Sequence, residues 1–163
     1  MEKSLQQLKE TLQRELEMYQ EILSMEKNKA EFIKSGDLER IEKTTLKEQQ
    51  YIKNMGTFEK LRRAIFTNMA AELQVIEIES ISDLLLYLKD EDMMEIDNLR
   101  NHLLSTIDRV KEVNELNETL INKHLEYVNF NIELMTSTPE GSHYGQKDTG
   151  RRKITSSLLD MKI

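Results

Sequence analysis

Apolar side chains recur at spacings of three and four residues along three long stretches of this chain, residues 5–33, 38–73 and 96–135. This spacing gathers them on one face of a helix, and such a stripe is stable only when another surface covers it. The pattern therefore predicts three long helices that pack on one another or on a partner.

The first stretch carries its stripe with a single charged residue, Glu26, in an otherwise apolar face. Gly36 follows it, a residue that readily takes the left-handed conformation at a helix end, and Asp37 can cap the next helix. Because the connection is so short, we expect the first two helices to lie antiparallel. The stripe consists of Leu5, Leu8, Leu12, Leu16, Tyr19, Leu23, Glu26, Ala30 and Ile33.

The apolar pattern of the second stretch is less regular, because charged residues fall near its apolar face. A buried charge needs a partner, and an ion pair between Glu59 and Arg62 or across helices would supply one. A stripe edge that reaches solvent explains them equally well. Gly56 marks either a bend or a close helix crossing. The expected stripe consists of Leu38, Ile41, Thr45, Ile52, Met55, Ile65, Phe66, Met69 and Leu73.

Residues 73–92 change pattern, and the apolar cluster 84–88 predicts a short helix laid across the end of the long pair. Its role is either a cover over the bundle end or a binding element. We therefore expect an all-α fold, an elongated antiparallel bundle of three long helices (residues 4–34, 37–73 and 92–136) and one short helix (residues 82–89). Residues 1–136 would form this domain and residues 137–163 a flexible C-terminal tail.

The last long helix carries three polar residues, Asn114, Asn117 and His124, within its apolar stripe. Buried Asn can fix the register of packed helices at some cost in stability. The alternative is a semi-polar groove that stays exposed until a partner helix fills it. Both interpretations remain open at the level of sequence.

Charge narrows the range of partners. The net charge is −7, but residues 137–163 carry five Lys or Arg and three Asp or Glu, so the rest carries −9. An acidic body argues against nucleic acid, which needs a clustered basic face. With no Cys and no long apolar run, the chain predicts a cytoplasmic protein without membrane insertion.

Signatures of catalysis are absent from the pattern. Leu99 and Ile121 stand three residues before His102 and His124, where the di-iron bundle motif requires Glu. The five Gly are scattered, so no phosphate-cradling loop is formed. We expect no enzyme, no metal and no cofactor; a phosphorelay module that uses His102 is a weak alternative.

Several segments together resemble the FlgN-type flagellar export chaperones, which attend hook–filament junction proteins before type III secretion. The resemblance rests on the acidic helical body, on residues 58–63 (FEKLRR), on Asn114 and Asn117 followed by Leu120 and Ile121, and on the pair Tyr144–Gly145. It implies a chaperone that binds the amphipathic C-terminal segments of junction proteins, prevents their premature assembly and delivers them to the export gate. It also implies that Tyr144 and Gly145 contact the cytoplasmic domain of that gate.

We place the cargo site on the C-terminal half of the last helix, residues 121–135, together with the linker that follows it, because disordered amphipathic segments fold into grooves between helices. The residues expected to bind cargo are Ile121, His124, Leu125, Val128, Ile132 and Met135. The main alternative is a structural coiled-coil or helical-bundle scaffold that acts by self-association, and a homodimer remains open. Downstream, Ile154, Leu158, Leu159, Met161 and Ile163 form a further apolar set, which would dock on the chain's own groove or mimic a cargo there.

Overall fold

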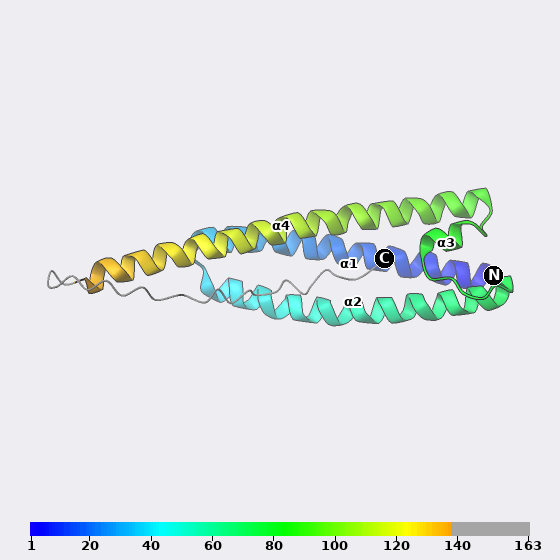
Figure 1. The fold of residues 1–163 in the computed structure, drawn as a ribbon, viewed down its shortest axis with the longest axis horizontal. Helices are drawn as coiled ribbons and strands as arrows, with labels where there is room; N and C mark the ends of the chain where they lie inside the picture. The colour runs from blue at the N-terminus through cyan, green and yellow to red at the C-terminus, as the bar shows by residue number, and fades with distance from the viewer. Residues whose placement is uncertain (138–163) are drawn as a thin grey trace.

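A computed structural model describes residues 1–137 of the chain. Four helices follow one another, with no strand in this range: α1 (Glu2–Ser35), α2 (Leu38–Leu73), α3 (Ile81–Leu85) and α4 (Asp90–Thr136). Figure 1 shows the three long helices side by side, with α3 at the end that holds the N-terminus. The all-helical expectation is confirmed.

The turn between α1 and α2 follows the expected chemistry. Gly36 ends α1 at φ 70°, in the left-handed region, and the Asp37 side chain accepts a hydrogen bond from the backbone N–H of Arg40 at 3.1 Å. A two-residue connection of this kind reverses the chain, so α2 runs back antiparallel along α1 (Figure 1).

Helix α1 lies at the centre of the molecule and packs on both α2 and α4. Within the described residues, no Cα atom of α2 lies within 8 Å of one of α4. Ion pairs and hydrogen bonds join early residues of α1 to early residues of α4, as with Lys9 and Asp92, so these two helices run parallel. Successive long helices run in opposite directions, as expected for an antiparallel bundle, but α4 packs on α1 and not on α2, so α1 lies between the other two.

The core follows from this arrangement, since α1 must be apolar on a broad face to contact two helices. Leu8, Leu12, Met69, Ile96 and Leu103 are completely buried. The short α3 adds Ile81 and Leu84 to this core and begins at a capping box formed by Ser80 and Asp83. It covers one end of the bundle and is shorter than the expected helix 82–89.

The expected stripe of α2 is wrong in its first half. Leu38 and Ile52 are exposed, as is Thr45, whereas Thr44 is buried and Tyr51 is half-buried. The face of α2 that meets α1 mixes polar and apolar residues, so counting apolar positions alone selected the wrong face. From Met55 onward the expected apolar residues do reach the core.

Candidate binding site

Charged residues inside the bundle are paired across helices. Arg62 of α2 donates to the Glu15 carboxylate of α1 at 2.7 Å, and both side chains are buried. Lys29 of α1 pairs with Glu48 of α2 in the same way. Of the two pairings expected for these charges, the one across helices is confirmed, whereas Glu59 pairs with Arg63 one turn along the surface of α2 and not with Arg62. These groups serve to hold α1 and α2 in register.

Glu26 and Asn117 form the corresponding polar layer between α1 and α4. The Asn117 amide donates to the backbone oxygen of Glu26 at 2.9 Å and to its carboxylate at 2.8 Å. Burial and the nearby Glu48 carboxylate raise the pKa of Glu26 to about 7, although Lys29 and Asn117 act in the opposite direction. Asn117 is thus a register-fixing core residue, whereas Asn114 is half-buried and His124 is exposed.

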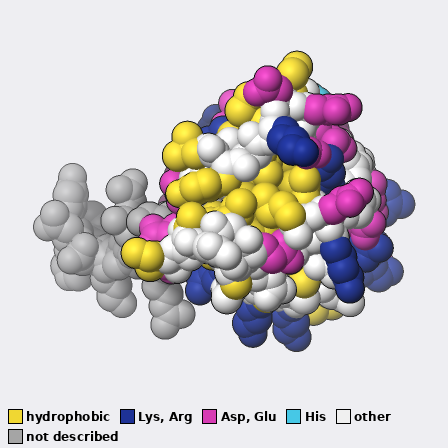
Figure 2. Space-filling model, turned by 90° about the vertical axis from the view of Figure 1, so that its right-hand side faces the viewer, with side chains coloured by type: hydrophobic (Ala, Val, Ile, Leu, Met, Phe, Trp, Pro, Cys, Tyr) yellow, Lys and Arg dark blue, Asp and Glu magenta, His cyan; other side chains and the backbone are white. Residues whose placement is uncertain are grey.

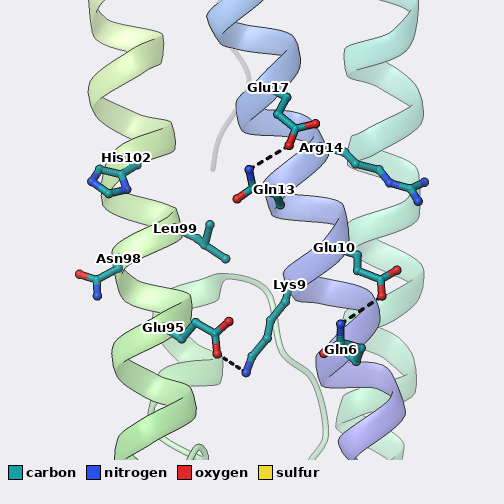
Figure 3. Close-up of a pocket in the computed structure, with 10 residues that line it drawn as sticks. All are labelled: Gln6, Lys9, Glu10, Gln13, Arg14, Glu17, Glu95, Asn98, Leu99 and His102. Carbon is teal, nitrogen blue, oxygen red and sulfur yellow. Dashed lines mark hydrogen bonds and ion pairs between the residues drawn. The ribbon is translucent and has the colours of Figure 1, made fainter.

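A shallow groove runs between the first half of α1 and the first half of α4. Figure 3 shows Lys9 reaching across it to Glu95, with Leu99 pointing toward the gap. Lys9 also donates to Asp92 at 2.9 Å, so its charge is already paired twice. His102 lies at the rim with its ring pointing away from α1 (Figure 3). Polar residues dominate this lining, which gives an apolar ligand little to bind.

Hydrophobic side chains also gather at the end of the molecule that holds the N-terminus and α3 (Figure 2). A hollow there is lined by Met1, Leu5, Tyr87 and Leu88 together with charged residues. The last turn of α3 and the loop after it leave Leu86 and Tyr87 partly in solvent. At this end α3 packs on α4, and its residues Ile81 and Leu84 are buried in the core.

The longest run of exposed apolar residues lies at the opposite end, where α4 continues past the α1–α2 turn (Figure 1). A Cβ atom placed on Gly36 would lie 3.8 Å from the His124 ring, so His124 marks the level of the turn. We call the residues beyond it, 125–136, the projecting segment. At about 1.5 Å per residue it extends roughly 18 Å beyond the body.

The predicted cargo residues lie on this segment and on the turn of α4 that precedes it. Ile121, Leu125, Val128, Ile132 and Met135 continue the face of α4 that packs on α1, and we call them the seam stripe. Ile121 is half-buried, whereas the other four are exposed, Met135 to 86%. His124 lies beside this stripe, next to the turn. The structure thus brings the predicted residues onto one surface that α1 is too short to cover.

A second set of apolar residues on the projecting segment was missed by the sequence analysis. Tyr127, Phe130 and Leu134 are spaced by three and four residues on the side of the helix away from the seam stripe, and each is more than half exposed. We call them the outer stripe. Their own spacing was the available signal, but it was hidden because the longer seam stripe accounted for the helix. Tyr144 and Gly145, expected to contact the export gate, lie outside the described residues.

The described residues thus form an extended helical body with a protruding helix end that carries two exposed apolar stripes, the architecture of an all-helical protein without an enclosed active-site cleft at that end. Within residues 1–137, every helix lacks the combination of length and hydrophobicity that crossing a bilayer requires. The same residues hold no group of three or more His, Asp or Glu side chains placed to bind a metal ion.

Comparison with known proteins agrees with this class. Residues 1–151 match the family described as "FlgN protein", and the chain belongs to that family of flagellar export chaperones. The chain is also similar to the uncharacterized protein YvyG of Bacillus subtilis (strain 168), with 23% identity over 137 residues, 84% of each chain. No solved structure matches the chain. Members of the family act by binding flagellar proteins and not by catalysis.

Proposed function

We propose that this protein is a cytoplasmic export chaperone for hook–filament junction proteins. It would bind their amphipathic C-terminal segments, prevent premature assembly and deliver them to the cytoplasmic domain of the flagellar type III export gate. The observation that carries this proposal is the seam stripe, an apolar helix face that packs on α1 up to the turn and then continues into solvent.

The geometry suits a helical cargo. Along the body, α1 covers the apolar face of α4, and α1 ends at Ser35 while α4 continues into the projecting segment. An amphipathic helix laid on Leu125, Val128 and Ile132 would continue the packing that α1 makes. Surfaces of this kind bind the apolar side chains of an amphipathic helix, which are spaced three and four residues apart. Met135 adds an adaptable side chain at the end of the stripe.

A substitution in the seam stripe tests the cargo site. Val128→Asp combined with Ile132→Asp places two charges where the cargo would be buried, and we expect the loss of at least about 2 kcal/mol of binding free energy, roughly thirtyfold in Kd. The measurement is calorimetry of full-length protein with a peptide of a junction-protein C-terminus. Because both residues are already exposed, the fold should be retained.

The control is Leu46→Asp, an exposed leucine on α2 that is 60% accessible and lies outside the projecting segment. It should leave the affinity unchanged. Equal losses in the two variants, or no loss in either, would contradict the site. Sedimentation of the parent chain addresses the scaffold alternative, since a tight dimer that buries the seam stripe without cargo would favour self-association.

The contact with the gate has a separate test. Tyr144→Ala should weaken binding to the cytoplasmic domain of the export gate while cargo affinity is retained, because Tyr144 lies outside the helical surface assigned to cargo. Pull-down with the purified gate domain measures the first property and calorimetry the second. If gate binding were unchanged, Tyr144 would not be the residue that contacts the gate domain.

A further inference from the structure

The outer stripe is a second apolar surface, and it is not part of the proposed cargo site. Tyr127, Phe130 and Leu134 lie on the far side of the projecting segment from the seam stripe, so one cargo helix on the seam would leave them in water. An apolar helix face with two aromatic side chains costs free energy when it stays exposed. A specific occupant is therefore expected.

Acidic residues border this stripe. Glu126 and Glu133 lie four residues before and three residues after Phe130, which places both next to it on the helix surface. The last turn of α4 contains no basic residue, although its carbonyl groups carry the negative end of the helix dipole. The electrostatics at this end of α4 therefore favour an occupant that is positively charged beside its apolar positions.

The chain itself contains such a segment. Arg151, Arg152 and Lys153 are followed by Ile154, Leu158 and Met161, whose spacing of four and then three would form a short apolar stripe on a helix. Read backwards, the outer stripe has the same spacing, four residues from Leu134 to Phe130 and three from Phe130 to Tyr127. Two helices with these spacings match position for position when they lie antiparallel.

We propose that residues 151–163 of this chain dock antiparallel on the outer stripe as a short helix. Ile154 would pack beside Leu134, Leu158 beside Phe130 and Met161 beside Tyr127. In this register the three basic residues lie at the C-terminal end of α4, next to Glu133, where the dipole and the carboxylate both attract them.

The length of the connection permits this return. About 17 residues, 137–153, join the end of α4 to Ile154, and a flexible chain of that length has a root-mean-square span of roughly 20–25 Å. Ile154 has to reach only the last turns of α4. Since both partners belong to one chain, their effective concentration is high even if each contact is weak.

A second copy of the chain fits the outer stripe less well. Two projecting segments placed face to face would bring Glu126 and Glu133 of one copy close to the same residues of the other, and these like charges repel. The intramolecular partner instead supplies opposite charge. The docked segment would leave the seam stripe open, so this inference stands or fails independently of the proposed cargo site.

Quenching of a fluorescent label by tryptophan tests the contact without any cargo. The full chain has neither Cys nor Trp, so a bimane label on Ser157→Cys and one introduced Trp are unique. Phe130→Trp places the quencher on the outer stripe, and Ile132→Trp places it on the seam stripe as the matched control. Both positions are exposed, to 58% and 52%, so both variants should fold.

We expect quenching several-fold stronger with Phe130→Trp than with Ile132→Trp, at a level independent of protein concentration. Reversal of the tail charges by Arg151→Glu, Arg152→Glu and Lys153→Glu should abolish the difference, and Glu126→Lys with Glu133→Lys should restore it. Equal quenching at the two positions, or none at either, would overturn the proposal. Quenching that rises with concentration would assign the stripe to a second copy and also overturn it.

Discussion

At the scale of single residues, the buried pair of Arg62 and Glu15 shows how charge is used inside this bundle. The two side chains are 7% and 4% exposed and hold α2 against α1. Such a pair contributes little net stability when intact, but removal of one partner leaves an uncompensated buried charge.

We therefore expect Arg62→Ala to lower the free energy of unfolding by about 3–5 kcal/mol, measured by urea denaturation. Replacement of both partners, Glu15→Leu with Arg62→Met, should recover most of this loss because no charge then remains unpaired. Arg63→Ala, at an exposed surface pair, is the control and should cost under about 1 kcal/mol. Similar losses in the two single variants would contradict a structural role for the buried pair.

Glu26 makes the stability of the bundle depend on pH. Its pKa rises from an ordinary value near 4.5 to about 7 in the folded chain, so the fold favours the protonated form. The stabilisation from this group is complete below about pH 4.5 and is lost as the pH rises toward 7.

Glu26→Gln should remove that dependence, since the amide keeps the shape without ionising. At pH 8 we expect the variant to be more stable than the parent, by about 1–3 kcal/mol, and near pH 5 the difference should be small. Urea denaturation at both pH values measures this, with the exposed Glu17→Gln as control. A parent and variant with parallel pH profiles would show that Glu26 ionises without penalty.

The sequence showed which polar residues lie within apolar stripes, but it did not show which of these residues contact one another. Glu26 and Asn117 were visible as polar positions in apolar stripes, and the structure joins them. For Arg62 the sequence left two options open, a partner on its own helix and a partner on another helix, because the alignment of two helices is not visible in the sequence. The structure pairs it with Glu15 of α1.

At the scale of helices, two glycines that look alike in sequence have opposite roles. Gly36 takes φ 70° at the end of α1, a conformation that side chains with a Cβ rarely adopt, while Gly56 lies within α2 with open space where a Cβ would be placed. Gly56 therefore does not mark a close helix crossing.

We expect Gly36→Ala to destabilise the chain by about 1 kcal/mol and Gly56→Ala to stabilise it by a similar amount. Thermal unfolding of the two variants under identical conditions measures both, and each serves as the control for the other. A stabilising effect at Gly36, or a loss at Gly56, would contradict the backbone geometry described here.

The spacing of apolar residues predicted the long helices correctly, but it was less successful in predicting which face of each helix is buried. The three long helices and the turn at Gly36 and Asp37 follow from local chemistry, which is contained in neighbouring residues. The first half of α2 was assigned the wrong face, since its contact with α1 uses Thr44, Glu48 and Tyr51 in place of apolar residues.

At the scale of the whole molecule, the exposure of the seam stripe arises from unequal helix lengths. Helix α4 spans 47 residues and α1 only 34, so two helices that run parallel from the same end leave the last part of α4 uncovered. Sequence predicted the residues of the seam stripe but not the reason for their exposure, because the parallel pairing of α1 with α4 is a property of the tertiary fold.

Hydrogen exchange of the full-length chain, with and without a junction-protein C-terminal peptide, tests the central claim most directly. Binding should increase the protection of backbone amides in residues 121–136 while those of α2 and α3 stay unchanged, since the cargo helix would lie on the seam stripe. If protection instead increased at the end of the molecule that holds α3, or in the groove between Lys9 and Glu95, the projecting segment would not be the cargo site.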